Sequence, residues 1–316
     1  MFEEKLYPNF RGRDFICMHD YTQEEIYQIL EVARVLKEKQ RRRESHPLLA
    51  GKTLGMIFTK SSTRTRVSFE TGIYQLGGYG LFLSANDIQL GRGETIQDTA
   101  LTLSRFLDGI MIRTFAHQDV LDLAQYATIP VINGLTDLLH PCQVMGDLMT
   151  VMENKGRLKG LKLAFIGDGN NVAHSLLIGG AKVGMDVTIA CPAGYEPNPD
   201  ILQLAQQDAS ETGARLSLVR DSREAVEEAD VLYTDVWASM GQEAEREKRI
   251  RDFTGYCIDK ALLQKAKPDA IVMHCLPAHR GEEITDEVID GPHSVVFEEA
   301  ENRMHIQKAI MALVMA

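Results

Sequence analysis

The sequence predicts an α/β protein with two domains of similar size, each a parallel sheet flanked by helices. Apolar, strand-like runs alternate with helix-like segments from end to end, which is typical of parallel sheets covered by helices. The length of 316 residues suggests about two domains of roughly 150 residues each. We expect one domain over 1–150 and a second over 151–298, with a last helix over about 299–316 packing back on the first.

Composition excludes several classes of protein. The chain is 44% hydrophobic and 25% charged, which is ordinary for a globular protein, and its net charge of −11 argues against nucleic acid or anionic membranes as main partners. No apolar run approaches the roughly 20 residues that span a bilayer, and the first residues form no secretory signal. The five cysteines are scattered and include no CxxC pair, which argues against a disulfide framework or a structural zinc site. We expect a soluble, cytoplasmic protein.

The first half begins with a helix near Thr22, where Glu25 completes a capping box. Strands are expected at 53–59, 80–83, 109–114 and 130–133, and helices at about 64–76, 95–107, 117–126 and 141–154. The polar, glycine-punctuated segment 154–160 has the composition of a linker.

The second half repeats this alternation. Strands are expected at 161–167, 186–191, 215–219, 231–236, 270–275 and 294–297, followed by a last helix whose apolar face carries Met304, Ala309, Ile310 and Leu313. Ligands of such sheets bind beyond the carboxyl ends of the strands. We therefore expect the active site at these ends, in the cleft between the domains.

The first strand ends in a hydroxyl-rich loop, Ser61-Ser62-Thr63, which leads into a helix with Arg64 and Arg66 in its first turns. Cations are unfavourable at a helix N-terminus, because the helix dipole is positive there. Two arginines are understandable if an anion is bound, since backbone N–H groups, hydroxyls and guanidinium groups together bind phosphate. The alternative is a capped surface helix with solvated arginines.

The third strand ends at Arg113, and the fourth leads to His140. Pro141 is suited to the first position of a helix, so His140 is expected at the N-cap and Gln143 in the first turn. A neutral imidazole at such a site can donate a hydrogen bond to a carbonyl oxygen. A histidine that only caps or packs is equally compatible with these residues.

The turn after residue 166 resembles a dinucleotide-binding fingerprint but departs from it. Gly167 and Gly169 fit, whereas Val172 occupies the position of the third glycine, and no ribose-binding acid follows about 20 residues on. A nucleotide-binding dehydrogenase module is therefore a weak alternative. Asn171 is the better candidate for a polar ligand contact.

Three further groups are expected at or near strand ends. Asp235 ends one strand, and its carboxylate could hold an ammonium group. Cys275 ends another, where a buried structural cysteine is the commoner case, and the next bond, Leu276–Pro277, could be cis. Arg303 lies early in the last helix. Cations and hydrogen-bond donors thus gather in the first half, and a carboxylate, an amide and a thiol in the second, which predicts acyl transfer from an acyl phosphate to an amine.

These residues resemble the signatures of the aspartate/ornithine carbamoyltransferase family over nearly the whole chain. The matching segments are Ser62-Thr63-Arg64-Thr65-Arg66, His140-Pro141-Cys142-Gln143, His274-Cys275-Leu276-Pro277, Asp235 with Ser239-Met240-Gly241, and Asn302-Arg303. The Asp235…Ser239-Met240-Gly241 segment resembles the loop of the ornithine-specific members. Carbamoyltransferases for aspartate, putrescine or acetylornithine, and a non-catalytic relative, are the alternatives. The loop 91–95 has no lysine of the kind an aspartate enzyme requires.

The resemblance implies a role for each residue. Carbamoyl phosphate would be bound by Ser62, Thr63, Arg64, Thr65, Gln89, Arg113, His140, Gln143, Cys275, Leu276 and Arg303, with Gln89 reaching the site of a neighbouring subunit and Leu276 acting through its backbone. L-ornithine would be bound by Asn171, Asp235, Ser239 and Met240. Arg113, His140, Asp235 and Cys275 would be catalytic. It also implies a homotrimer or a multiple of trimers, no metal or organic cofactor, and closure of the second domain with the loop 239–241 as a lid.

Overall fold

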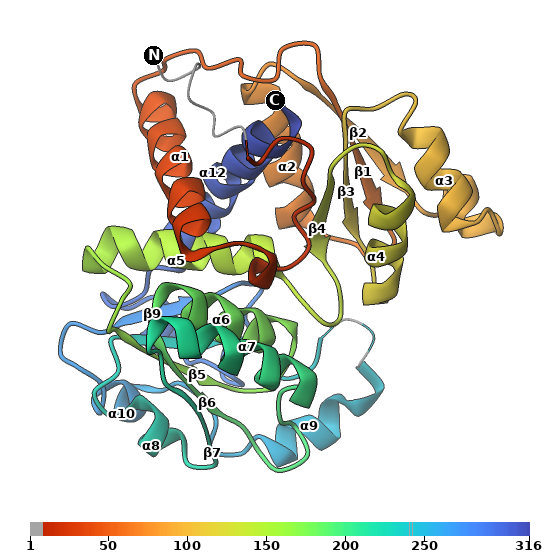
Figure 1. Ribbon diagram of the computed structural model, residues 1–316. Helices are drawn as coiled ribbons and strands as arrows, with labels where there is room; N and C mark the ends of the chain where they lie inside the picture. Colours follow the sequence, from red (N-terminus) through yellow and green to blue (C-terminus); the bar gives the residue numbers. More distant parts are fainter. Residues whose placement is uncertain (1–8, 240, 242) are drawn as a thin grey trace. The chain divides into compact units, whose positions relative to one another are not determined.

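The computed structural model describes residues 9–239, 241 and 243–316, which form two compact units. Unit 1 comprises Met1–Gly146 and Asn302–Ala316, and unit 2 comprises Asp147–Glu301. Each contains one parallel sheet with helices packed on it (Figure 1). The predicted fold class is therefore confirmed.

The sheet of unit 1 has four parallel strands in the order β2-β1-β3-β4. The strands are β1 (Thr53–Phe58), β2 (Tyr79–Ser84), β3 (Gly109–Arg113) and β4 (Val131–Leu135). The three strands β1, β3 and β4 are almost wholly buried, whereas the edge strand β2 is partly exposed. Burial on both faces explains why these strands are continuous apolar runs without alternation.

Helices cover both faces of this sheet. The helical segments are η2 (Met18–Asp20), α1 (Gln23–Arg41), α2 (Thr63–Gln75), η3 (Gln89–Arg92), α3 (Ile96–Leu103) and α4 (His117–Tyr126). Thr22 and Glu25 form the predicted capping box of α1. The apolar side chains of α3 and α4 pack on one face around Ile57 and Ile112. On α2, Gly72 permits close approach of Met311, since a Cβ there would lie 3.1 Å from the Met311 Cε.

Two long helices contribute residues to both units. They are α5 (Pro141–Lys155) and α12 (Val296–Met315). The division between the units falls inside α5, so the polar segment 154–160, expected as a linker, follows that boundary and belongs to unit 2.

The sheet of unit 2 has five parallel strands in the order β7-β6-β5-β8-β9. They are β5 (Lys162–Ile166), β6 (Asp186–Ala190), β7 (Leu216–Val219), β8 (Val231–Thr234) and β9 (Ile271–His274). The helical segments are α6 (Asn171–Val183), α7 (Pro199–Thr212), α8 (Ser222–Val226), η4 (Glu243–Glu245), α9 (Arg246–Asp252), α10 (Lys260–Leu263) and α11 (Asp286–Ile289). A buried cluster around Trp237, Phe253 and Val272 forms a core of this unit.

Two sequence-based boundaries are wrong. The run 294–297 is not a strand: Ser294 forms only an isolated bridge with Val272, and α12 begins at Val296. Short apolar runs do not distinguish a strand from the start of a buried helix, which explains the error. The helix expected to reach residue 107 ends at Leu103, where Ser104 turns back to donate its hydroxyl to the Ala100 carbonyl.

None of the helices formed by the described residues has both the length and the continuous apolar character needed to cross a bilayer.

Candidate active site

The N-terminus of α2 lies at the carboxyl end of β1, as the sequence predicts. Ser62 is the N-cap, and its hydroxyl accepts a hydrogen bond from the Thr65 backbone N–H at 3.1 Å. Thr63 and Arg64 follow in the first turn, with Thr63 exposed and Arg64 half-buried. The capped turn aims its backbone N–H groups away from the helix, where an anion can be bound.

Two arginines from distant parts of the chain meet at the hydroxyl of Thr65. The Arg303 guanidinium donates to the Thr65 Oγ1 at 2.9 Å, and that of Arg113 at 3.3 Å. All three side chains are buried, with exposed fractions of 4%, 7% and 0% for Arg303, Arg113 and Thr65. The fold therefore brings two buried positive charges to the start of α2.

Arg66 is not part of this cationic group. Its guanidinium pairs with Glu70 at 3.1 Å and lies over the Phe82 ring, 3.7 Å from the ring centroid. Of the two arginines from which an anion was inferred, only Arg64 still supports that inference: among the described residues, no side chain pairs with its guanidinium.

His140 is the residue before α5, as predicted from Pro141. It is buried, and its carbonyl accepts the backbone N–H groups of Gln143 and Val144. Burial, and next the positive charges of Arg303, Arg113 and Lys60, hold the pKa of His140 well below its ordinary value. The imidazole is therefore neutral at physiological pH, as expected, although burial contributes more to this than any other cause. Gln143 is fully buried in the same turn.

Lys60 is a component that the sequence analysis missed. It immediately precedes the hydroxyl-rich loop, its ammonium pairs with Asp137 at 2.8 Å, and it lies over the Phe115 ring. With an exposed fraction of 7%, it adds a third buried cation to the group around His140. A lysine in a polar loop gives no sequence signal of burial, so only the fold could reveal it.

Gln89 is exposed on η3, in the segment that follows β2. An exposed position is what a residue needs if it is to reach another subunit.

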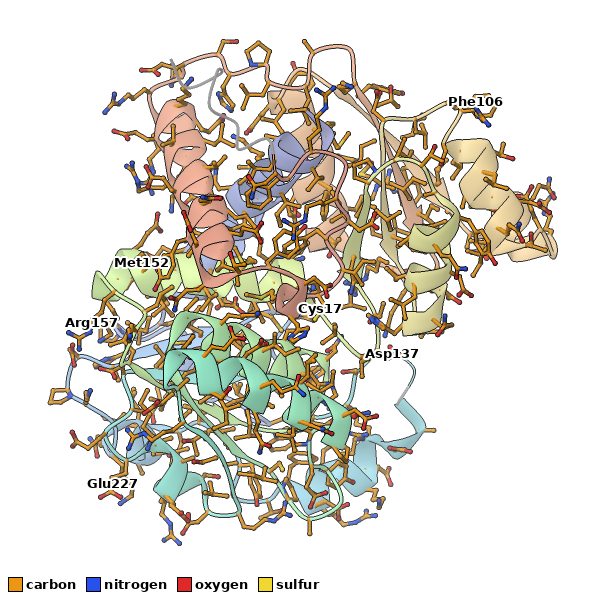
Figure 2. All side chains as sticks on the ribbon, in the orientation of Figure 1. Cys17, Phe106, Asp137, Met152, Arg157 and Glu227 are labelled. Carbon is orange, nitrogen blue, oxygen red and sulfur yellow. The ribbon has the colours of Figure 1, made fainter. Side chains whose placement is uncertain are left out.

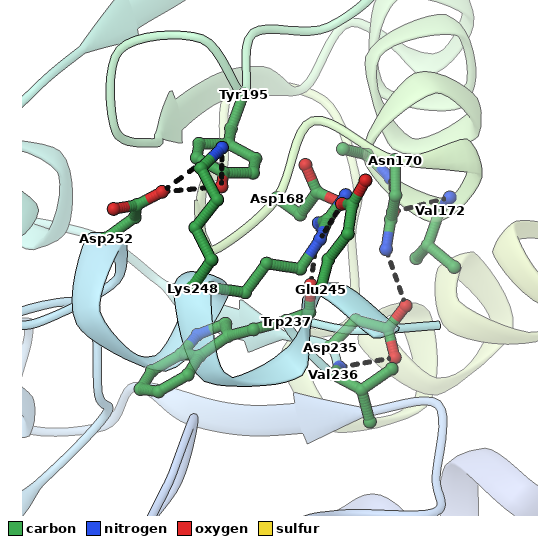
Figure 3. A network of polar contacts seen from close by, with 12 residues as sticks. Asp168, Asn170, Val172, Tyr195, Asp235, Val236, Trp237, Glu245, Lys248 and Asp252 are labelled. Carbon is green, nitrogen blue, oxygen red and sulfur yellow. Dashed lines mark hydrogen bonds and ion pairs between the residues drawn. The ribbon is translucent and has the colours of Figure 1, made fainter. Parts of the chain in front are cut away.

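In unit 2, Asp235 follows β8 and lies at the centre of a small hydrogen-bonded group. Its Oδ1 accepts a hydrogen bond from the thiol of Cys275 at 3.0 Å. Its Oδ2 accepts one from the side-chain amide of Asn170 at 2.8 Å (Figure 3). Asn170 also caps α6 through its side-chain oxygen, which accepts the N–H groups of Val172 and Ala173. The residue that contacts Asp235 is thus the neighbour of the predicted Asn171.

Cys275 follows β9, and burial together with the neighbouring Asp235 carboxylate raises the pKa of its thiol well above the ordinary value. The thiol therefore remains protonated and acts as a hydrogen-bond donor. It cannot serve as a thiolate base in the ligand-free protein.

The remaining predicted residues of this site lie on the loops around it. Asn171 is the first residue of α6 and is half-buried, and Ser239 is half-buried beyond β8. Met240 lies outside the described residues. The bond Leu276–Pro277 is cis, and Leu276 has a φ of 57°.

The conformation of Leu276 is supported by His274. The His274 Nδ1 accepts the Leu276 backbone N–H at 2.9 Å, and its Nε2 lies 3.1 Å from the Glu283 Oε1. Because Nδ1 accepts, Nε2 must carry the proton and donate it to the carboxylate. Both side chains are fully buried, so the backbone after Cys275 is held by a rigid pair.

A network anchored on Arg249 fixes the loop that precedes residue 239. The Arg249 guanidinium donates to Asp168 and to the carbonyl of Trp237, each at 2.8 Å, and to Glu245 at 3.1 Å (Figure 3). This joins the turn after β5 to both sides of the loop expected to act as a lid.

The glycines that resemble a dinucleotide fingerprint have a packing explanation. A Cβ at Gly169 would lie only 2.3 Å from the Pro197 nitrogen, and the Gly169 N–H donates to the Tyr195 carbonyl. The segment 195–197 therefore covers the turn against which a pyrophosphate would have to lie, which disfavours the dehydrogenase alternative.

Two groups among the described residues gather atoms of the kind that bind metals: Asp235 with His274 and Cys275, and His279 with Glu282 and Glu283. In the first group, both ring nitrogens of His274 are engaged, and the Cys275 thiol donates to Asp235. Hydrogen bonds within the protein thus account for the closeness of Asp235, His274 and Cys275.

The chain is similar to known proteins over nearly its whole length. Residues 13–153 match the family model "Aspartate/ornithine carbamoyltransferase, carbamoyl-P binding domain", and residues 159–314 match the "Asp/Orn binding domain" of the same family. The ornithine carbamoyltransferase of Thermococcus kodakarensis is 60% identical over 304 residues, covering 96% of each chain. The anabolic ornithine carbamoyltransferase of Pyrococcus furiosus is 58% identical over 304 residues, again 96% of each chain.

Solved structures give the same result. An ornithine carbamoyltransferase structure from Pyrococcus furiosus matches with a TM-score of 0.94 at 58% identity, covering 97% of this chain and 98% of that one. One from Giardia lamblia matches with a TM-score of 0.86 at 32% identity, covering 95% and 97%. The chain belongs to the aspartate/ornithine carbamoyltransferase family.

Proposed function

We propose that this chain transfers the carbamoyl group of carbamoyl phosphate to the δ-amine of L-ornithine, giving L-citrulline and phosphate. The observation that carries the proposal is the meeting of Arg113 and Arg303 at Thr65, beside the capped start of α2 and a neutral His140. The relatives' names support ornithine as the acceptor.

Unit 1 provides what a carbamoyl phosphate requires. The phosphate would be bound by Ser62, Thr63, Arg64 and Thr65 at the helix N-terminus, with Arg303 beside them. Arg113 and His140 would donate hydrogen bonds to the carbonyl oxygen, and Gln143 would hold the carbamoyl amide. As the amine attacks, negative charge grows on that oxygen, and each fixed donor aimed there contributes about 3 kcal/mol.

Unit 2 provides what an amine nucleophile requires. Asp235 would bind the δ-ammonium group of ornithine, while Asn171, Ser239 and Met240 would bind the rest of the amino acid. Cys275, with the backbone of Leu276, would contact the carbamoyl end. A lysine-like amine is mostly protonated at neutral pH, with a pKa near about 10, and only its neutral form attacks.

In the transfer, a C–N bond forms and the bond from the carbonyl carbon to the phosphate oxygen breaks. The amine must lose protons as this happens. The thiol of Cys275 is already protonated, since its pKa is raised, so it would orient the amine rather than deprotonate it. The Asp235 carboxylate and the departing phosphate are the acceptors that remain.

We also propose that the chain assembles as a trimer or a multiple of trimers through unit 1, with Gln89 reaching a neighbouring subunit. Large exposed apolar side chains support this: among the described residues they are Val67, Tyr74, Tyr79, Phe82, Leu101, Phe106, Phe115 and Leu121 in unit 1, but only Leu218 and Phe297 in unit 2. Phe106, 73% exposed, points outward in Figure 2.

The proposed compartment is the cytoplasm, where free thiols stay reduced.

The proposed assembly is tested by Tyr74→Glu with Tyr79→Glu, which places charge on two of the most exposed rings. We expect the wild type to sediment as a trimer or larger, and the double variant to be smaller and less active. A wild-type monomer with full activity would contradict the assembly without affecting the proposed reaction.

The proposed reaction is tested by measuring citrulline formation with saturation curves for both substrates. We expect turnover of ornithine, with citrulline and phosphate as the products. Robust carbamoylation of putrescine with ornithine ignored would overturn the acceptor. We expect hyperbolic dependence on carbamoyl phosphate, as in an anabolic enzyme; a sigmoidal curve would indicate the catabolic type.

A further inference from the structure

Glu299 is a buried acid that the proposed mechanism does not use. It lies in the first turn of α12, with an exposed fraction of 1%. Its Oε2 accepts the backbone N–H of His274 at 3.0 Å, and its Oε1 accepts the hydroxyl of Tyr233 at 3.1 Å. A buried carboxyl group with two such specific partners requires an explanation beyond packing.

Both partners of Glu299 are on the strands that end in the proposed ornithine site. His274 is the last residue of β9 and precedes Cys275, while Tyr233 lies in β8, two residues before Asp235. The two strands are paired, with Tyr233 opposite Met273. One carboxyl group thus joins two neighbouring strands just before the point where Asp235 and Cys275 meet.

Glu299 has a second acid beside it. Asp147, on α5 and 1% exposed, forms a side-chain hydrogen bond with Glu299. Two carboxyl groups in one hydrogen bond must hold a proton between them. Burial, and next the charge of Asp147, hold the pKa of Glu299 well above its ordinary value. Both causes favour a neutral Glu299.

A neutral Glu299 matters for the site in front of it. Burial, and next the Asp235 carboxylate, raise the pKa of the Cys275 thiol. With Glu299 protonated, the strand ends are joined without placing another full negative charge near Asp235 and Cys275. An ionised carboxylate at this fully buried position would carry a large cost of burial.

We propose that Glu299 is a positioning residue that joins β8 to β9 and thereby holds Asp235 and Cys275 in the geometry that binds the δ-amine of ornithine. The inference rests on the proposed function of that site. Glu299 touches neither substrate, so its effect must reach the reaction through the two strand ends.

The test compares Glu299→Ala and Glu299→Gln with Glu298→Ala, an exposed neighbour in the same helical turn. For Glu299→Ala we expect kcat/KM for ornithine to fall about tenfold or more, with KM for carbamoyl phosphate within about twofold of wild type. For Glu299→Gln, we expect kcat/KM for ornithine within about threefold, because this neutral side chain can accept from the His274 N–H through its oxygen and donate to the Tyr233 hydroxyl oxygen and to Asp147 through its amide NH2 group. Glu298→Ala should match the wild type.

Three outcomes would overturn the inference. Ornithine kinetics of Glu299→Ala equal to those of Glu298→Ala would remove the positioning role. A loss confined to the fraction of active, folded enzyme, with both KM values unchanged, would make Glu299 merely structural. A Glu299→Gln variant as impaired as Glu299→Ala would refute the claim that a neutral side chain suffices at this position.

Two further variants keep the test decisive. If Glu299→Ala does not fold, Tyr233→Phe removes one of the two links. We then expect a smaller selective fall in kcat/KM for ornithine, and unchanged kinetics would contradict the inference.

Asp235→Asn separates the hypothesis of the ornithine site from that of the positioning role of Glu299. If it keeps full activity, the proposed ornithine site is wrong, whereas an inactive Asp235→Asn beside a fully active Glu299→Ala would refute only the positioning role.

Discussion

The two units build their candidate sites at equivalent places but with opposite charge. In unit 1, Lys60, Arg113 and Arg303 surround His140, and in unit 2 a carboxylate, Asp235, faces the thiol of Cys275. Burial keeps both the imidazole and the thiol neutral, and the neighbouring charges act in the same direction in each case. Cations disfavour an imidazolium, and a carboxylate disfavours a thiolate.

This comparison teaches that each site is completed by the charge of its ligand. A group of buried cations favours an anion such as a phosphate in unit 1, whereas the Asp235 carboxylate favours an ammonium group in unit 2. The neutral histidine and thiol then serve as hydrogen-bond donors that do not compete with those charges.

The largest effect is expected from removing one of the buried cations of unit 1. Arg113→Met removes one of the two guanidinium groups at Thr65 and a proposed donor to the carbonyl oxygen, so we expect kcat to fall about 10²- to 10³-fold. A steady-state citrulline assay measures it. Arg215→Met, at an exposed arginine paired with Asp186, is the matched control and should be unaffected. Equal activity of the two variants would disprove the role of Arg113.

A buried cation outside either site shows what such a charge costs. Lys308 on α12 is fully buried and donates to Gln75 at 2.9 Å, and burial lowers its pKa to about 8. Because the folded-state pKa is below the ordinary value, the contribution of Lys308 to stability is present above about pH 10.5 and is lost as the pH falls through about 8.

Lys308→Met should therefore raise the free energy of unfolding at pH 7 by about 2 kcal/mol and flatten its dependence on pH between 8 and 10.5. Urea unfolding at several pH values measures this. Lys265→Met, at an exposed lysine, should change neither quantity. A destabilised Lys308→Met would mean that the bond to Gln75 outweighs the burial of the charge.

The influence of the Asp235 carboxylate in unit 2 can be measured through the reactivity of the Cys275 thiol. Since the Asp235 carboxylate raises the pKa of this thiol, Asp235→Asn should lower the pKa and speed alkylation of Cys275 at pH 8 by about tenfold. Mass spectrometry of the peptide containing Cys275 follows the reaction, with Cys257 as the internal reference. An unchanged rate would mean that burial alone protects the thiol.

The smallest expected effect concerns the titration of His140. Its lowered pKa predicts that the imidazole stays neutral as the pH falls through 6.5, so the stability it contributes is present above 6.5 and lost only when the pH falls through the lower folded-state value. Arg303→Met should raise that pKa without restoring the ordinary value, because burial is the larger cause. Nitrogen chemical shifts of labelled histidines measure both, and an ordinary titration in the wild type would contradict the prediction.

The sequence was sufficient wherever local chemistry determines local structure. The capping box at Thr22, the N-terminal position of Pro141 and the continuous apolar strands all follow from residues a few positions apart. It failed at 294–297, where a short β-branched run continues into a buried helix. The partners of a residue far along the chain could not be predicted in the same way.

The candidate site shows this limit most clearly. Asn170 and Asn171 are neighbours, and nothing in their sequence indicates that Asn170 would be the one to reach Asp235. Lys60 and Glu299 looked like ordinary polar positions of a loop and a helix, yet both are buried by elements far away in the sequence. Burial of a charged side chain depends on what the fold places around it.

The helix α12 has a consequence for how the protein is made. It supplies unit 1 with Arg303 and with buried residues such as Ile310 and Met311, although the rest of that unit ends at Gly146. On the ribosome, the first 146 residues emerge long before their last helix, and all of unit 2 is synthesised in between. Unit 1 must therefore wait, with part of its apolar surface uncovered, so chaperone dependence during translation should fall on the half of the chain that is made first.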